Sequence, residues 1–251
     1  MRKLASIILF LVIASNSFAQ SKNSPLQISH LTGDFYVYKT FNDYNGVKIS
    51  ANALYLVTDK GVVLFDAPWD KTQFEPLIDS IKTKHNKDIV MVFATHSHDD
   101  RAGGLDFYRK KGIKTYSGNL TDKILKEKKE PRAEFVLPND TTFTVGNHKF
   151  EVYYPGKGHA PDNIVVWFNK EKILYGACFI KSAEAEDLGY LGDSDVKEWE
   201  KSIKKVQSKF KNPTYVIPGH EGGTTSKSIN HTLKLVQDYN LSKKGSPKTG
   251  K

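Results

Sequence analysis

The chain has 251 residues, enough for one large domain with a substantial core. Its formal net charge of +9 would suit a nucleic-acid-binding protein if the bases were clustered in the folded part of the chain. Six of the bases, however, lie near the two ends, at Arg2, Lys3, Lys243, Lys244, Lys248 and Lys251. The remainder is nearly balanced and has no basic stripe interleaved with aromatic residues, so we expect no nucleic-acid partner.

The N-terminus has the layout of a secretory signal peptide. Arg2 and Lys3 precede an apolar run over Leu4–Ala14, and Ser17-Phe18-Ala19 supplies small residues at a cleavage-like position. The apolar run is too short to cross a bilayer as a helix, and its flanks favour export over a buried N-terminal helix. We therefore predict a signal peptide over residues 1–19, followed by a mature chain with no membrane attachment.

Hydrophobic periodicity predicts strands alternating with helices over the mature chain. The predicted strands are Leu31–Tyr38, Ala53–Val57, Val62–Phe65, Ile89–Ala94, Phe143–Val145, Phe150–Tyr154, Ile164–Phe168, Ile173–Tyr175 and Tyr215–Ile217. The predicted helices are Phe74–Lys84, Leu105–Lys111, Leu120–Lys128, one through Val196, Trp199, Ile203 and Val206, and one through Ile229, Leu233 and Val236. This order predicts a single α/β domain over residues 20–251, with helices covering two mixed sheets. We expect its tail, Ser242–Lys251, to lack regular structure.

Four of these strands end in residues that can bind a metal ion. The strand ends and their following residues are Ile89–Ala94 with His96, His98 and Asp100; Phe150–Tyr154 with His159; Ile173–Tyr175 with Cys178; and Tyr215–Ile217 with His220. Sites in α/β proteins form beyond the carboxyl ends of strands, where loops from several strands meet. We therefore expect these side chains to converge on one metal centre.

The donor types predict zinc, since a thiolate ligand disfavours magnesium and calcium. His96, His98 and His159 would form one site with a position open to water. Asp100, Cys178 and His220 would form a second. Each residue also has an ordinary interpretation, because single histidines often cap helices and a lone cysteine is often a small buried apolar residue. The clustered spacing, without a C-x-x-C pair, favours an open catalytic site over a closed structural one.

The motifs resemble those of the subclass B1 metallo-β-lactamases. The resemblance rests on Thr95-His96-Ser97-His98-Asp99-Asp100-Arg101-Ala102-Gly103-Gly104, Gly158-His159, Cys178-Phe179-Ile180-Lys181-Ser182 and Pro218-Gly219-His220, and it extends over nearly the whole mature chain. It implies the αββα sandwich of that family and the same two sets of zinc ligands. It also implies that Lys181 binds the substrate carboxylate and that Thr40–Lys48 is a flap over the substrate. Asp66, at the end of the strand Val62–Phe65, has two interpretations: it orients a ligand or Arg101, or it caps the following turn.

The resemblance further implies a function. We expect a periplasmic, monomeric enzyme with two zinc ions per chain that opens the β-lactam ring of antibiotics through a metal-bound hydroxide oriented by Asp100, and that confers resistance. Thioesterase, lactonase and nuclease relatives usually have a second histidine where Arg101 stands and an acid where Cys178 stands. Those activities, and a metal-binding protein without catalysis, remain the alternatives.

The chain also departs from the family pattern. Many relatives place an asparagine in the loop after the lysine, where it can polarise the lactam carbonyl, and we expect Asp195 at this position. An ionised carboxylate cannot donate a hydrogen bond to an oxyanion. The substrate range among penicillins, cephalosporins and carbapenems therefore does not follow from the sequence.

Overall fold

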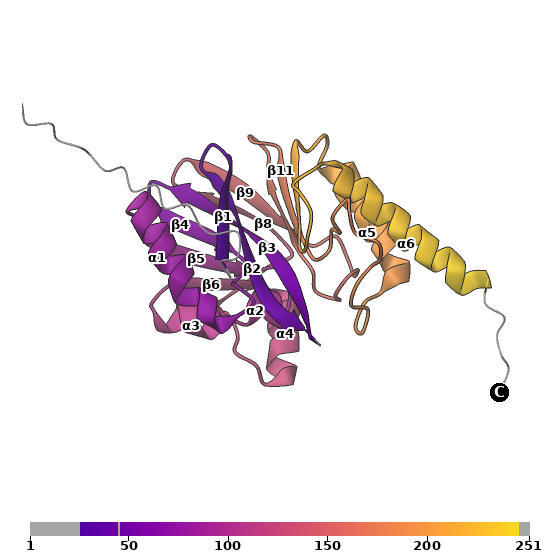
Figure 1. Cartoon of the computed structure of the whole chain (residues 1–251), viewed down its shortest axis with the longest axis horizontal. Helices are drawn as coiled ribbons and strands as arrows, with labels where there is room; N and C mark the ends of the chain where they lie inside the picture. The colour runs from indigo at the N-terminus through magenta and orange to yellow at the C-terminus, as the bar shows by residue number, and fades with distance from the viewer. Residues whose placement is uncertain (1–25, 45, 246–251) are drawn as a thin grey trace, which may run out of the picture.

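The computed structural model describes residues 26–44 and 46–245, so the predicted signal peptide over residues 1–19 lies outside the described part of the chain. Two β-sheets pack face to face, and helices cover the outer surface of each (Figure 1). This arrangement confirms the predicted αββα sandwich. Among the described residues, no helix is both long and apolar enough to span a membrane.

The larger sheet contains seven strands, which are antiparallel from β1 to β4 and parallel from β4 to β7. In spatial order they are β1 (Leu26–Thr32), β2 (Phe35–Tyr44), β3 (Val47–Thr58), β4 (Gly61–Phe65), β5 (Ile89–Ala94), β6 (Lys114–Gly118) and β7 (Phe135–Leu137). The smaller sheet has the order β12 (Tyr215–Pro218), β11 (Ile173–Ala177), β10 (Val165–Phe168), β9 (His148–Tyr153) and β8 (Asp140–Val145). In this sheet only β11 and β12 run parallel.

The helices divide between the two outer surfaces (Figure 1). Those on the larger sheet are α1 (Phe74–His85), which follows the short 3-10 helix Lys71–Gln73, and α2 (Asp99–Ala102), α3 (Leu105–Lys110) and α4 (Asn119–Lys128). Those on the smaller sheet are α5 (Val196–Lys209) and α6 (Lys227–Gly245). Leu77 and Ile81 of α1 pack against the larger sheet, and Trp199 and Ile203 of α5 pack against the smaller one.

The central strands are apolar on both faces because each face is covered. Along β4, Val63 and Phe65 point into the interface between the sheets, whereas Val62 and Leu64 point towards α1. Successive side chains of a strand point to opposite faces, so a continuous apolar run fills two cores at once. An uninterrupted apolar segment of the sequence therefore indicates a strand that is covered on both faces, as in a sandwich of two sheets with helices outside each.

Three sequence-based expectations differ from the structure. The predicted strand Leu31–Tyr38 is broken by a turn at Gly33, which has a φ of +50° and joins β1 to β2. Strands β6 and β7 were not predicted, because β6 is polar and β7 spans three residues. Finally, α6 continues to Gly245, beyond the expected start of the tail at Ser242, while residues 246–251 lie outside the described part.

The two sheets are tied together at the end where the predicted ligands lie. The backbone N–H of Asn52 in β3 donates to the carbonyl of Gly219 after β12 at 2.8 Å. The N–H of Ile164 before β10 donates to the carbonyl of Thr95 after β5 at 2.9 Å. These bonds join segments of both sheets and hold their carboxyl ends next to each other.

Helix α5 begins at a side-chain cap. The carboxylate of Asp195 accepts a hydrogen bond from the backbone N–H of Glu198 at 3.1 Å, and its carbonyl accepts one from Trp199 at 2.8 Å. Such a cap satisfies an N–H group that has no partner inside the helix, and a carboxylate also interacts favourably with the helix N-terminus.

We predict that Asp195→Ala lowers the free energy of unfolding by about 1 kcal/mol, whereas Asp195→Asn changes it by a few tenths, because asparagine caps about as well. Denaturant unfolding of the two variants would measure both values. Asp79→Ala, which removes an exposed carboxylate from the middle of α1, is the matched control and should not lower stability. Equal losses in the Ala and Asn variants would contradict the capping role.

Candidate metal centre

Three imidazoles converge at the carboxyl end of the larger sheet. His98 Nδ1 lies 3.1 Å from His96 Nε2 and 3.2 Å from His159 Nε2. His96 and His98 follow β5 of the larger sheet, whereas His159 lies between β9 and β10 of the smaller sheet. All three rings are close to perpendicular to one another, so their nitrogens meet at one point.

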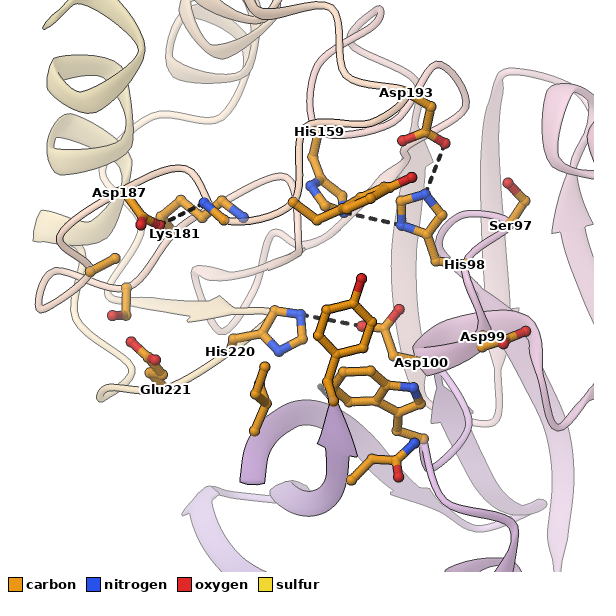
Figure 2. Close-up of a pocket in the computed structure, with 18 of the residues that line it drawn as sticks. Ser97, His98, Asp99, Asp100, His159, Lys181, Asp187, Asp193, His220 and Glu221 are labelled. Atoms are coloured by element: carbon orange, nitrogen blue, oxygen red, sulfur yellow. Dashed lines mark hydrogen bonds and ion pairs between the residues drawn. The ribbon is translucent and has the colours of Figure 1, made fainter. Parts of the chain in front are cut away.

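A second cluster lies beside the first. The sulfur of Cys178 is 3.3 Å from Asp100 Oδ2 and 3.2 Å from His220 Nε2, and these two atoms are themselves 3.3 Å apart. Asp100 lies on α2, Cys178 directly follows β11, and His220 follows β12. The structure therefore brings together all six predicted ligands, and each cluster draws on both sheets. Figure 2 shows four of them, His98, Asp100, His159 and His220.

The donor atoms of both clusters fit zinc. Zinc–nitrogen bonds of about 2.0–2.1 Å in a tetrahedral site place two nitrogens roughly 3.3 Å apart, close to the separations of the three imidazole nitrogens. The Nδ1 of His159 is also buried, and it has no hydrogen-bond partner among the described residues. No protein contact at Nδ1 therefore holds the ring in an orientation that would turn Nε2 away from the cluster. Closed structural sites use four protein ligands, whereas three from each cluster leave room for water or substrate.

The protonation preferences of these residues support metal binding. Burial lowers the pKa of His96 and of His159 well below the usual value, with further lowering by His98 and Lys181 respectively, so both rings are neutral at physiological pH. Burial acts to raise the pKa of Asp100, but Arg101 and His220 outweigh it and hold this pKa well below the usual range. Burial raises the pKa of the Cys178 thiol, so this thiol has to lose a proton when it binds a metal ion.

A buried guanidinium forms the floor below the second cluster. Arg101 is fully buried; its Nε lies 3.2 Å from Cys178 Sγ and 3.0 Å from Asp100 Oδ2. Its two Nη atoms donate to the carbonyls of Asn52 and Gly219, each at 2.7 Å. Arg101 thus stabilises the anionic forms of both Cys178 and Asp100, and it links the two sheets at the same time.

Two strained backbone positions adjoin this floor. Asp66 after β4 has a φ of 71°, and Ala177 before Cys178 has a φ of 44°. Such conformations cost about 1–3 kcal/mol each in residues other than glycine, and the surrounding structure has to enforce them. The packing also requires a glycine at position 219, where a Cβ atom would lie 2.4 Å from the backbone nitrogen of Cys178.

Asp66 is held by several donors. Its carboxylate accepts hydrogen bonds from the backbone N–H and hydroxyl of Thr95 at 2.7 and 2.9 Å and from the hydroxyl of Tyr175 at 2.5 Å. Arg101 Nη1 lies 3.5 Å away. The predicted supporting role of Asp66 is thus consistent with its contacts to Arg101 and to the residue before His96.

Two residues of each cluster, His98 and His159 of the first and Asp100 and His220 of the second, line a cavity of about 690 Å³. Its wall includes Asn42 and Tyr44 of the predicted flap, Thr40–Lys48, together with Ile49 of β3 and Trp69. Lys181, predicted to bind substrate, also lines the cavity and is 8% exposed, with its ammonium 5.6 Å from the ring centre of Trp199. Burial lowers the pKa of Lys181, while the nearby acidic groups oppose this effect.

One expectation about the pocket was wrong. Asp195 was expected to face the substrate, but among the described residues it is not part of the cavity wall, because its carboxylate caps α5. Asp193, two residues earlier, lines the cavity, and its Oδ2 lies 2.9 Å from His98 Nε2 (Figure 2). Tyr190 also lies on the wall, with its ring edge-on to His98. The sequence offered only a polar loop here, so it did not distinguish these residues.

The Asp66 carboxyl predicts a pH effect on stability. Burial raises its pKa from 3.8 to about 6, although Arg101, Tyr175 and Thr95 act in the opposite direction. As the pH rises through this window, the unfolded chain loses the Asp66 proton before the folded chain does. The folded state is therefore progressively destabilised, by up to about 3 kcal/mol.

Asp66→Asn removes this titration. The stability of metal-free Asp66→Asn relative to metal-free wild type should therefore increase between about pH 4 and pH 6. Urea unfolding at several pH values would measure the difference, with Asp59→Asn, an exposed acid, as the control. A difference that stays constant over this range would show that the Asp66 pKa is not raised.

Comparisons with known proteins agree with this geometry. Residues 47–220 match the family model of the metallo-beta-lactamase superfamily. The chain is 46% identical over 231 residues to a metallo-beta-lactamase type 2 of Elizabethkingia meningoseptica, covering 92% of both chains. It is 44% identical over 206 residues to metallo-beta-lactamase IND-1 of Chryseobacterium indologenes, covering 82% of this chain and 86% of that one.

Solved structures give the same result. The crystal structure of metallo-beta-lactamase IND-7 superimposes with a TM-score of 0.82 at 43% identity, covering 87% of this chain and all of that one. A metallo-beta-lactamase from Pontibacter korlensis also superimposes with a TM-score of 0.82, at 31% identity. With the family model spanning both ligand clusters, these matches show that the chain belongs to the metallo-β-lactamase superfamily.

Proposed function

We propose that the protein is a zinc-dependent hydrolase that opens the β-lactam ring of antibiotics and so confers resistance. The observation that carries this proposal is the placement of two three-ligand clusters, with different donors, side by side, with two residues of each lining one cavity. The relatives at 44% and 46% identity are named metallo-beta-lactamases, which supports the substrate class. The ligand set, with Cys178 in the second cluster, is that of subclass B1.

The proposal includes the ligands of each metal ion, the oligomeric state and the compartment. His96, His98 and His159 hold one zinc ion, and Asp100, Cys178 and His220 hold another. When bound, zinc supplies Lewis acidity and lowers the pKa of a water ligand to about 7. The domain over residues 20–251 acts as a monomer in the periplasm after removal of residues 1–19, and it needs no nucleic-acid or membrane partner.

The protein's own groups then determine how the substrate reacts. Asp100 is ionised, so it accepts hydrogen bonds only, and it orients the attacking water. The water oxygen bonds to the lactam carbonyl carbon, the carbon–nitrogen bond breaks, and the ring nitrogen takes up the proton that the water gives up. Lys181 binds the carboxylate that β-lactams carry beside the ring. Trp69 and the β2–β3 hairpin form part of the wall of this cleft.

Turnover of a chromogenic cephalosporin by the purified mature chain tests the proposal. We expect hydrolysis that stops when a chelator removes the metal and returns when zinc is added. Cys178→Ala should bind one ion fewer and lose most of this activity, with the fold unchanged by circular dichroism. Turnover of thioesters, lactones or phosphoesters in place of β-lactams would contradict the substrate class, and zinc binding without any turnover would indicate a metal-binding protein.

Lys181 is expected to bind the substrate without taking part in ring opening. Its contact with the substrate carboxylate exists in both the ground state and the transition state, so its loss should chiefly raise KM. A charge-assisted hydrogen bond contributes about 1.5–3 kcal/mol, so Lys181→Ala should raise KM about tenfold or more while kcat stays within a few-fold.

Steady-state kinetics, with zinc content measured alongside, would check this expectation. Lys170→Ala, which removes an exposed lysine from the turn between β10 and β11, is the matched control. A large loss of kcat at constant KM, or a loss of zinc from Lys181→Ala, would assign Lys181 a different role.

A further inference from the structure

One short segment of the loop before α5 contacts two residues of the three-imidazole cluster. This segment, Tyr190–Asp195, places the Asp193 carboxylate 2.9 Å from His98 Nε2 and the Tyr190 ring edge-on to the His98 ring, at 5.7 Å between ring centres. The Ser194 hydroxyl donates to the carbonyl of His159 at 2.7 Å. Figure 2 shows Asp193 and His159 next to different nitrogens of the His98 ring.

The segment is also fixed at its end. The backbone N–H of Asp195 donates to the carbonyl of Gly158 at 2.9 Å, and the Asp195 side chain caps α5. The loop and the residues just before and at His159 are therefore held together by hydrogen bonds. Asp193 is the residue through which this unit reaches across the cleft to His98, which belongs to the other sheet.

The contact with Asp193 determines which nitrogen of His98 can bind metal. A neutral imidazole carries its proton on one nitrogen and a lone pair on the other. The Oδ2 atom of Asp193, 2.9 Å from His98 Nε2, is placed to accept a hydrogen bond, so this contact selects the form of His98 with the proton on Nε2. The lone pair is then on Nδ1, the atom that faces His96 and His159.

From this geometry we propose that Asp193 is a positioning residue for the three-imidazole site: it fixes the ring orientation and the tautomer of His98 and thereby raises the metal affinity of this site and not of the Cys178 site. The inference rests on the proposed zinc function of the six ligands. The inference goes beyond the zinc function because it assigns a specific role to Asp193, an acid outside the set of six ligands. Carboxylates that accept the second N–H of a metal-binding histidine typically raise metal affinity by about 10- to 100-fold.

Cobalt(II) titration of the metal-free protein tests the proposal without relying on activity. A thiolate bound to cobalt gives a near-ultraviolet charge-transfer band, so that band reports the site containing Cys178. The visible ligand-field bands report both sites. Competition with a chromophoric chelator then gives an affinity for each site in wild type, Asp193→Ala and Asp193→Asn.

We expect Asp193→Ala to weaken the three-imidazole site by about 10- to 100-fold while the thiolate band saturates at the wild-type cobalt concentration. Asp193→Asn keeps an oxygen that accepts from Nε2, so it should lose less affinity than the alanine variant. Glu186→Gln, which neutralises an exposed acid on the same loop, is the matched control and should bind both ions as wild type does.

Two results would overturn the assignment of Asp193. One is unchanged affinity of the three-imidazole site in Asp193→Ala. The other is equal weakening of both sites in the alanine and asparagine variants, which would indicate general loosening of the loop. If the wild-type protein itself binds no cobalt at the six ligands, then the proposed metal function fails before the variants are compared, so the two failures are distinguishable.

Discussion

The centre depends on the burial of one cation between the two sheets. Removing a guanidinium from water costs several kcal/mol unless anions and carbonyl groups surround it. Arg101 meets this requirement with Asp100, with Cys178, and with the carbonyls of Asn52 and Gly219. These groups come from β3, from α2 and from the ends of β11 and β12. The burial of Arg101 therefore requires these groups to stay in contact with its guanidinium. Because they belong to both sheets, the same contacts hold the two sheets next to each other.

This cation also makes the two clusters chemically different. The first set consists of three imidazoles, two of which, His96 and His159, are held neutral by burial. Asp100 and Cys178 bring negative charge to the other set, next to the positive charge of Arg101. An ion in the second cluster thus shares its anionic ligands with a fixed cation, which weakens their donation. Two adjacent ions in this cavity would accordingly have unequal affinities, although their ligands differ little in geometry.

The layers and the ligands could be predicted from the sequence because each leaves a periodic or positional signal. Continuous apolar runs such as Val62–Phe65 indicate strands buried on both faces, and the residues after them lie at one edge. Strand β6 leaves no such signal, because most of its residues are polar. They are buried because neighbouring strands cover them and not because they are hydrophobic. The roles of Asp193 and Asp195 could not be separated either. The side-chain directions of two loop residues two positions apart cannot be assigned until the first residue of the following helix is known. In the structure Asp195 caps α5, and Asp193 faces His98.

Each ligand cluster contains residues from both sheets, and this arrangement affects the stability of the protein as well as its chemistry. An ion held by residues of both halves is a cross-link, and it closes the sandwich at the end where the chain is strained. Binding restricted to the folded state adds about 4 kcal/mol of stability when free zinc exceeds its dissociation constant a thousandfold. If the proposed zinc ions bind as described, a chain without them would lose its chemistry and this added stability together, and it would open more often to degradation. Zinc supply would thus set the amount of this protein as well as its activity.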